Sequence, residues 1–341
     1  MHRSGLTYTA VAAVVMAIAP QAQSQTNLRI DSWLAPTQTM NAAVLPHFAK
    51  AVEEGSQGRV KISISYPPNP NPATFIDRLT DGISDIMWSF HGYNTNRFLL
   101  TQIVELPGLD ANCEQSAVAY QRIHERFLDS AGEHKGVKLL SVFTHGAGVL
   151  HTRQAVTRID QLKGLKIRTA GGINSEVANA LGLVQVPAPA NKVYEIVSQG
   201  VADGSLMPFE SKETFKLKEV APYSLVYPGG FYYGSFWMAM NQTKYDKLSK
   251  ADREAIDRIS GEALARVNGK AWDVYDEAGR KAGLAAGNTY TVASPEFAKQ
   301  LAERLAPIER AWVDSATKKG VDGRTALDAL RAEVKKLKSK S

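Results

Sequence analysis

The stretch from Leu162 to Phe209 constrains the fold most, because strands and helices alternate along it with short connections. Its pattern predicts a buried strand over 165–168, a helix over 174–181, a second strand over 183–186 and another helix over 192–199. Alternation of this kind is typical of a parallel sheet with helices packed on its faces. The sequence therefore predicts an α/β fold for this region.

Arg168 stands at the carboxyl end of the first of these strands, where α/β proteins commonly meet their ligands. Gly171 and Gly172 follow and bring the start of the next helix beside the arginine. A guanidinium group and free helix N–H groups can then converge on one anion. The alternative is that Arg168 pairs with an internal carboxylate and the glycines only form a tight turn, and the residues alone leave both open.

The N-terminal residues are typical of an export signal. A basic start precedes an uncharged, largely apolar run over 6–19, and small residues at 22–24 suit cleavage. We therefore predict a signal peptide over 1–24 and a mature chain that begins near Gln25. No later segment approaches about 18 uninterrupted apolar residues, so we expect no membrane span.

Composition excludes several classes of function. Cys113 is the only cysteine, which excludes an internal disulfide and a cysteine-based zinc site. The seven histidines lack metal-ligand spacing, so we expect neither a metal nor a cofactor. The net charge of +6 is concentrated in the export signal and in lysines of the C-terminal tail, so it does not indicate a nucleic-acid partner. No nucleophile has a base at a recognisable spacing, so we expect no enzyme activity.

Two segments of the chain repeat one pattern, in which a helix ends and is followed by Gly-x-x-Asp. The segments are residues 75–85 and 193–203. The repeat predicts two similar α/β lobes, each with a mostly parallel sheet, and a ligand cleft between them. The alternative is a chance recurrence, because glycine and aspartate commonly end helices.

The expected domains follow from this repeat and from the points where the chain crosses between lobes. We predict lobe 1 over 25–145 plus about 233–275, and lobe 2 over 146–232 plus about 276–341. One long helical pattern over 246–286 is long enough to brace both lobes. We expect Pro307 and Gly320 to separate the helices of the C-terminal region.

Residues 160–168, Asp-Gln-Leu-Lys-Gly-Leu-Lys-Ile-Arg, together with Pro187, Tyr194, residues 200–204 and Pro208, carry a resemblance to a known family. The chain resembles the substrate-binding proteins of tripartite ATP-independent periplasmic (TRAP) transporters, the DctP family, over nearly all of its mature length. The resemblance implies a two-lobed periplasmic binding protein with a long bracing helix. It also implies two partners, an organic acid ligand and the membrane subunits of the transporter.

By this resemblance, Arg168 is the arginine that pairs with the ligand carboxylate. The family's sialic-acid binders have another arginine where this chain has Gly148. Members that bind polar acids tend to have asparagine where Met207 stands before Pro208. Both differences remove polar contacts, which argues against a sugar acid as the ligand.

Many aromatic residues fall in the loops that we expect to face the cleft. They predict a pocket with one charged end and an apolar body, suited to an aromatic or similarly apolar monocarboxylate. The alternatives are a C4-dicarboxylate or other small acid, a receptor of an ATP-dependent transporter, and a periplasmic enzyme. The candidate ligand-binding residues are Arg168, Trp88, His91, Tyr93, Gly148, Met207, Phe209 and Phe231, with Phe90, Tyr232 and Trp237 as further aromatic candidates and His145 as a possible polar neighbour.

Overall fold

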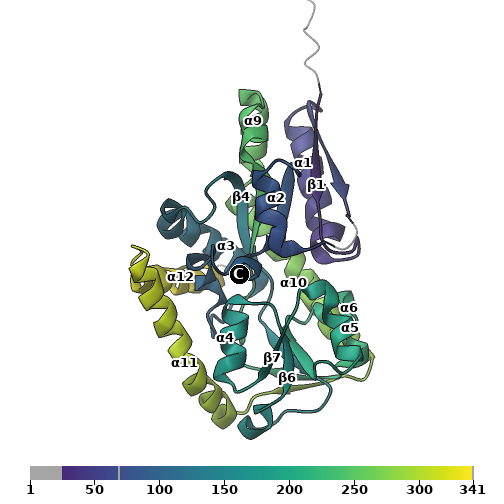
Figure 1. The fold of residues 1–341 in the computed structure, drawn as a ribbon, viewed down its shortest axis with the longest axis vertical. Coiled ribbons are helices and arrows are strands. Elements are labelled where there is room, and N and C mark those ends of the chain that lie inside the picture. Colours follow the sequence, from purple (N-terminus) through teal and green to yellow (C-terminus); the bar gives the residue numbers. More distant parts are fainter. Residues whose placement is uncertain (1–24, 68–69, 340–341) are drawn as a thin grey trace, which may run out of the picture.

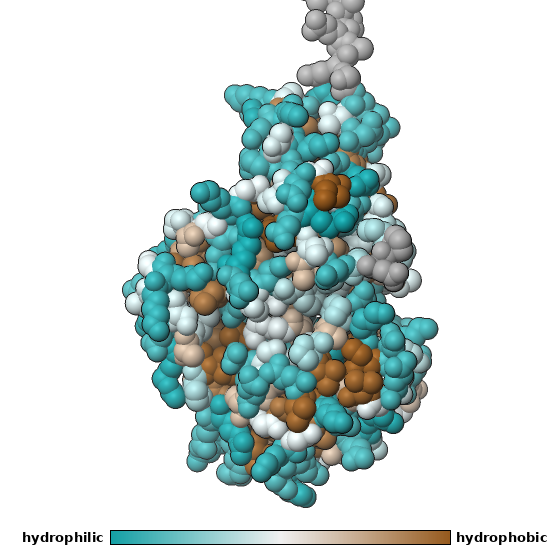
Figure 2. Space-filling model, viewed as in Figure 1, coloured by the Kyte–Doolittle hydropathy of each residue, from teal (hydrophilic) through white to brown (hydrophobic). Residues whose placement is uncertain are grey.

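The computed structural model describes residues 25–67 and 70–339, so the predicted export signal lies outside the described residues. Two β-sheets, each covered by helices, form an upper and a lower lobe (Figure 1). The predicted α/β class with two lobes is confirmed. Figure 2 shows a largely hydrophilic face on which hydrophobic residues gather mainly over the lower lobe.

The sheet of lobe 1 has five strands in the order β2-β1-β3-β10-β4. Strand β10 is antiparallel to both of its neighbours, and the other four strands share one direction. The strands are β1 (Thr26–Asp31), β2 (Val60–Ser65), β3 (Ile86–Phe90), β4 (Val137–Thr144) and β10 (Ser235–Asn241).

The sheet of lobe 2 has six strands in the order β11-β9-β5-β8-β6-β7. Here only β5 runs against the other strands. The strands are β5 (Val149–Thr152), β6 (Lys166–Thr169), β7 (Val184–Pro187), β8 (Gly204–Met207), β9 (Tyr223–Val226) and β11 (Thr289–Val292).

The reversed strand of each sheet is the strand that arrives from the other lobe. The chain passes from β4 to β5 and returns from β9 to β10. A strand whose first residue lies at the cleft is antiparallel to strands whose last residues lie at the cleft. The carboxyl ends of the parallel strands in both lobes therefore face the space between them, which is where open α/β sheets bind ligands.

The sequence repeat corresponds to one structural unit used twice. Gly82 and Gly200 end the repeated helices at nearly the same left-handed φ, 74° and 73°. The carboxylate of Asp85 then accepts a 2.9 Å hydrogen bond from the backbone N–H of Arg29 on the neighbouring parallel strand. Asp203 accepts a 2.9 Å bond from the N–H of Lys166 in the same way. Each aspartate accepts a backbone N–H of an adjacent parallel strand, so the recurrence is structural.

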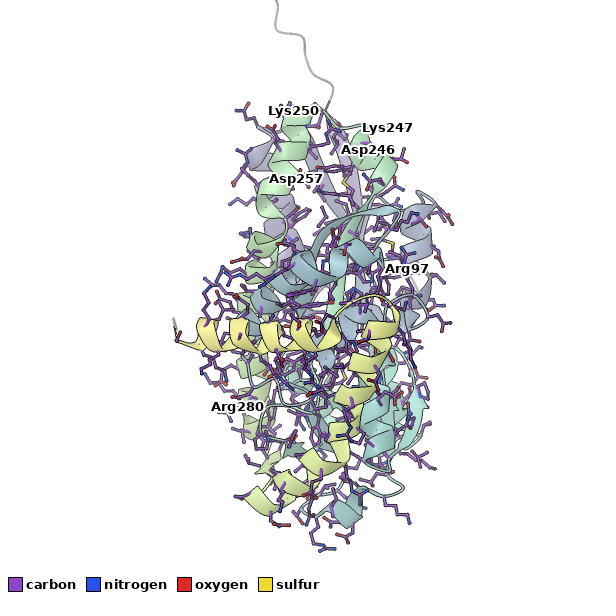
Figure 3. The ribbon with its side chains drawn as sticks, turned by 90° about the vertical axis from the view of Figure 1, so that its left-hand side faces the viewer. Arg97, Asp246, Lys247, Lys250, Asp257 and Arg280 are labelled. Carbon is purple, nitrogen blue, oxygen red and sulfur yellow. The ribbon has the colours of Figure 1, made fainter. Side chains whose placement is uncertain are left out.

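Helices cover both sheets, and α11 and α12 wrap across them (Figure 3). They are α1 (Leu45–Gly55), α2 (Phe75–Thr80), α3 (Cys113–Ile123), α4 (Gly172–Ala180), α5 (Val193–Ser198), α6 (Ser211–Thr214), α7 (Leu217–Val220), α8 (Gln242–Asp246), α9 (Lys250–Ile259), α10 (Glu262–Ala285), α11 (Pro295–Lys318) and α12 (Gly323–Lys338). Short 3₁₀ turns η3 (His91–Asn94) and η4 (Leu100–Glu105) follow β3. None of the helices in the described part of the chain is long and apolar enough to cross a membrane.

The prediction of one uninterrupted helix over 246–286 is wrong, because this region forms α8, α9 and α10. The break between α9 and α10 lies at Gly261, which has a φ of 59° and donates its N–H to the Leu140 carbonyl at 2.6 Å. Helix α10 still braces both lobes. Asp273 accepts the N–H of Cys113 in α3 at 2.7 Å, and Asp276 accepts the N–H of Glu210 after β8 at 3.0 Å.

Pro307 does not separate two helices, contrary to the expectation from sequence, but lies inside α11. A proline in a helix interior costs about 3 kcal/mol. The apolar face of α11 buries Leu301, Leu305 and Trp312, and burial of each such side chain contributes roughly 1.5–3 kcal/mol. The free energy gained by packing this face therefore outweighs the cost of the proline in the helix.

Candidate ligand-binding site

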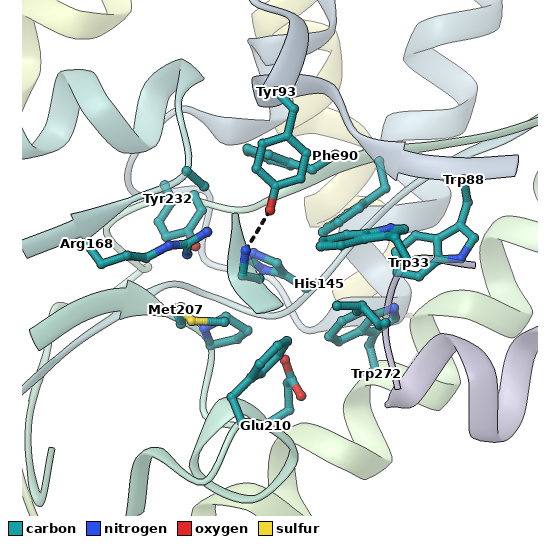
Figure 4. A pocket seen from close by; sticks show the side chains of 16 residues that line it. Trp33, Trp88, Phe90, Tyr93, His145, Arg168, Met207, Glu210, Tyr232 and Trp272 are labelled. Carbon is teal, nitrogen blue, oxygen red and sulfur yellow. Dashed lines mark hydrogen bonds between the residues drawn. The ribbon is translucent and has the colours of Figure 1, made fainter. Parts of the chain in front are cut away.

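A cavity lies between the lobes, the kind of place where proteins commonly bind small molecules (Figure 4). Most of its wall is aromatic. The lining residues are Trp33, Leu34, Trp88, Phe90, Tyr93, His145, Arg168, Ala170, Ala190, Met207, Pro208, Glu210, Phe215, Tyr232, Phe236 and Trp272.

The cavity walls come from the strand ends that face the cleft. Trp33 follows β1, Phe90 ends β3 and His145 follows β4 in lobe 1. Arg168 lies in β6 and Met207 ends β8 in lobe 2. The topology thus brings side chains from well-separated parts of the sequence to one small space.

Arg168 is buried, with 1% of its surface exposed, and its guanidinium reaches the cavity from β6. Its Nε atom donates a 2.8 Å hydrogen bond to the Ala188 carbonyl, whereas its Nη2 atom is buried and has no hydrogen-bond partner among the described residues. No carboxylate among the described residues forms an ion pair with it. The alternative of an internal carboxylate partner for Arg168 therefore does not hold in this part of the chain.

None of the first residues of α4 lines the cavity, contrary to the expectation from the glycine pair. The Ile173 N–H donates to the Glu105 carboxylate at 3.1 Å. Gly171, with a φ of 94°, packs so closely on lobe 1 that a β-carbon there would lie 2.2 Å from the Gly92 carbonyl oxygen. The glycines therefore allow close contact between the lobes, and Glu105 accepts one N–H of the helix terminus.

Burial keeps the other titratable side chains of the cavity uncharged at neutral pH. Burial lowers the pKa of His145 from 6.5 to about 4, so its imidazole is uncharged at neutral pH. Burial, with a smaller contribution from Asp276, raises the pKa of Glu210 from 4.5 to about 8. Burial also raises the pKa of Tyr93. Arg168 is therefore the one full positive charge that the described lining carries, and no negative charge opposes it.

Tyr93 links the lobes across the top of the cavity. The Ala190 N–H, after β7, donates a 3.0 Å hydrogen bond to the Tyr93 hydroxyl oxygen (dashed in Figure 4). The Trp33 and Tyr93 rings meet edge-on, with centroids 5.5 Å apart. Since its oxygen accepts from Ala190, the Tyr93 O–H remains free to donate.

Four of the eight candidate residues from sequence line the cavity: Arg168, Trp88, Tyr93 and Met207. Of the further candidates, Phe90, Tyr232 and His145 line it as well. Their contact with a ligand stays a prediction.

The other four candidates lie outside the lining. His91 is buried beside His134, with their Nε2 atoms 2.9 Å apart. Phe209 packs on Tyr290 at 4.7 Å between ring centroids, and Phe231 packs on Tyr227 at 5.3 Å.

Gly148 lies directly behind a wall residue. Its N–H donates to the Tyr232 carbonyl at 2.7 Å, and the Tyr232 ring fills the space of a side chain at position 148. Gly148 therefore shapes the cavity through Tyr232 instead of lining it. Trp237, on β10, also lies outside the lining.

The sequence analysis did not identify Trp33, Glu210, Phe236 or Trp272 as cavity residues. Trp33 lies just after β1, so the strand-end rule that selected Arg168 also applies to it. Phe236 and Trp272 lie in a strand and a helix with ordinary core spacing, which gave no signal. No group of three or more His, Cys, Asp or Glu side chains in the described ranges could hold a metal ion.

Comparison with known proteins identifies the family of this chain. Residues 31–315 match the family described as bacterial extracellular solute-binding protein, family 7, DctP. The chain belongs to this family. A TRAP periplasmic solute-binding protein from Bordetella bronchiseptica, solved with bound (R)- and (S)-mandelate, is 35% identical with a TM-score of 0.89, over 92% of this chain and 99% of that one.

Two further relatives support the assignment. A TRAP solute-binding protein from Rhodoferax ferrireducens T118, in complex with copurified benzoate, is 28% identical with a TM-score of 0.86, over 93% of this chain and 100% of that one. A Comamonas testosteroni protein named outer membrane transporter protein TsaT is 31% identical over 95% of this chain and 96% of its own length. The resemblance to TRAP substrate-binding proteins is thus confirmed, and this DctP-family chain is a TRAP solute receptor.

Proposed function

We propose that this receptor captures an aromatic monocarboxylate in the periplasm and delivers it to the membrane subunits of a TRAP transporter. The observation that carries the proposal is the buried guanidinium of Arg168, which has no carboxylate partner among the described residues and lies in an aromatic cavity. A buried charge is costly unless a partner compensates it. A ligand carboxylate supplies that partner through charge-assisted hydrogen bonds.

The rest of the cavity favours a flat, apolar ligand body. Trp33 and Trp88 lie on the side away from Arg168 (Figure 4), and the Phe236 ring lies 6.1 Å from that of Trp88 between centroids. Aromatic contacts contribute about 0.5–1.5 kcal/mol each beyond area burial. A C4-dicarboxylate would need a second cation, and the described lining has only Arg168. The mandelate and benzoate bound to the two solved relatives support the same class of ligand.

Binding, not turnover, is the proposed activity. Closure of the lobes excludes water and strengthens the ion pair. Its contribution to the binding free energy equals the difference between the ligand's affinities for the closed and the open state. The membrane partner completes transport by receiving the ligand. An enzyme would instead convert a bound acid, so recovery of the ligand unchanged after prolonged incubation distinguishes the two activities.

Thermal unfolding with a panel of acids tests the proposal. A ligand at about 100 times its Kd stabilises the protein by about 2.7 kcal/mol, which is readily measured as a rise in Tm. Benzoate, phenylacetate and mandelate should raise Tm more than succinate or sialic acid at equal concentration. A larger shift with succinate or sialic acid than with every aromatic acid would contradict the aromatic assignment, and no shift with any carboxylate would contradict the carboxylate site.

A further inference from the structure

Glu210 places a second polar group in the cavity, on a different wall from Arg168. It lies between Met207 and Trp272 at the bottom of Figure 4, with 1% of its surface exposed. Its backbone N–H donates to Asp276 of α10 at 3.0 Å, which fixes its position. A carboxyl group in such an apolar wall is costly unless it has a specific partner.

Only one of the two Glu210 carboxyl oxygens has a protein partner in the described structure. Oε2 contacts the Thr214 hydroxyl, which also lies 3.1 Å from the Glu210 backbone carbonyl. The hydroxyl can donate its one proton to that carbonyl and accept the proton of a neutral Glu210 carboxyl group. Oε1 then remains an acceptor, and no described residue donates to it.

We propose that Glu210 determines the specificity of this cavity, because its Oε1 atom accepts a hydrogen bond from a hydroxyl group on the ligand. The receptor accordingly selects hydroxylated aromatic monocarboxylates over their unsubstituted parents. This inference rests on the proposed function, with Arg168 binding the carboxylate. The raised pKa of Glu210 agrees with it, since a neutral carboxyl at neutral pH accepts a hydrogen bond without burying a charge.

The chemistry of the acceptor excludes two kinds of ligand. A second carboxylate has no proton to donate at neutral pH and would face the oxygen of Glu210. A methyl ether has the size and the oxygen of a hydroxylated ligand but no proton. Both lose the Glu210 contact, whereas an apolar wall would accept the ether at least as well as the hydroxyl.

Matched acids test this on the unaltered protein by calorimetry. The pairs are phenylacetate with mandelate and benzoate with 3- and 4-hydroxybenzoate, and each hydroxylated acid has its methyl ether as a control. At least one hydroxylated acid should bind about tenfold more tightly than its parent, as expected for one good hydrogen bond to a buried acceptor. Its methyl ether should lose that gain. Equal affinities within every set, or an ether that keeps the gain, would overturn the proposal.

Two variants of Glu210 test whether this residue causes the tighter binding of hydroxylated acids. Glu210→Gln keeps an oxygen acceptor and an N–H donor for Thr214, so it should retain the preference for the hydroxyl. Glu210→Leu has a similar size without polar atoms, so the ratio of affinities should fall to about one. A tenfold preference that survives in Glu210→Leu would contradict the role of Glu210.

The same titrations separate the two levels of inference. If benzoate and phenylacetate bind but the hydroxyl adds nothing, the role of Glu210 fails and the aromatic acid receptor stands. If no aromatic acid binds at all, the proposed function itself fails, and with it the role of Glu210. Should Glu210→Leu not fold, the hydroxyl and ether series on the unaltered protein still decides the question.

Discussion

The ring of Tyr232 occupies the space that a side chain at Gly148 would need, with two ring carbons 2.2 Å from the position of a β-carbon there. Tyr232 lines the cavity beside Arg168, and its hydroxyl donates to the Leu206 carbonyl at 3.1 Å. An arginine at 148, which the family resemblance implies for sialic-acid binders, is therefore incompatible with this aromatic wall. Gly148 thus leaves room for the Tyr232 ring, and the ring makes this part of the cavity wall apolar.

Gly148→Ala should push Tyr232 into the cavity. Overpacking of this kind costs typically 1–3 kcal/mol, so we expect a lower Tm and an affinity for benzoate reduced at least severalfold. Gly55→Ala in α1 is a suitable control, since a β-carbon there would meet Ala255 at an ordinary 3.6 Å. Differential scanning calorimetry and ligand titration measure both effects. Equal behaviour of the two variants would show that Tyr232 moves freely.

Arg168→Ala should abolish binding and leave the unliganded protein folded. Removal of one member of a desolvated charge pair costs roughly 3–5 kcal/mol, which is about two to four decades in Kd. Arg168→Lys should also bind poorly, because an ammonium group cannot reproduce the planar fork. Circular dichroism checks the fold and calorimetry the affinity. Binding by Arg168→Ala within a few-fold of the unaltered protein would mean that the arginine has a structural role only.

The raised pKa of Glu210 predicts a dependence of stability on pH. The folded state holds its proton up to about pH 8, whereas the unfolded chain releases it near 4.5. This group's contribution is therefore fully present below pH 4.5 and is lost as pH rises towards 8, by up to about 1.4 kcal/mol per pH unit. Lys212 acts in the opposite direction above about pH 7, because burial lowers its pKa to about 7.

Glu210→Gln isolates this one carboxyl group from Lys212 and the histidines. The free energy of unfolding of the variant, relative to the unaltered protein, should rise between pH 5 and pH 8 and level off above. Denaturant titrations at several pH values give this difference directly. Glu195→Gln is a control, because Glu195 is exposed on α5. A constant difference for Glu210→Gln across the range would show that this carboxyl is already ionised in the folded protein.

The fold could be predicted from sequence where the information is local. The apolar pattern placed β6 and β7 within one residue of their observed bounds, and Gly-x-x-Asp identified both copies of the repeated unit. The helix break at Gly261 and the continuation through Pro307 were missed, because both depend on packing against distant segments.

The site was predictable only in part, for the same reason. Arg168 follows from its place at a strand end. The partner of the α4 terminus does not, because Glu105 is separated from Ile173 by 68 residues along the chain. Trp272 lies on a helix whose apolar spacing is that of any core helix, so only the three-dimensional arrangement of the fold identifies it as a wall residue.

A variant at the contact between Gly171 and Gly92 should impair closure of the lobes without changing a residue that lines the cavity. Neither glycine lines the cavity, yet a β-carbon at 171 would lie 2.2 Å from the Gly92 carbonyl oxygen of the other lobe. Gly171→Ala should therefore hold the lobes apart and weaken binding of benzoate by about tenfold or more, as expected for an overpacked contact. The dissociation rate should rise with it, because an incompletely closed cleft releases its ligand sooner.

Gly171 has a φ of 94°, so an alanine there also strains the backbone. The effect of this strain must be distinguished from that of the steric clash with Gly92. Gly182→Ala is the matched control, because Gly182 also has a positive φ, 74°, but the nearest atom to a β-carbon there is 3.9 Å away. Both variants should lose stability, and only Gly171→Ala should lose affinity beyond that loss. Small-angle scattering with saturating benzoate should show a larger radius of gyration for Gly171→Ala than for the control. Equal radii and equal Kd values in the two variants would mean that the lobes close without this contact.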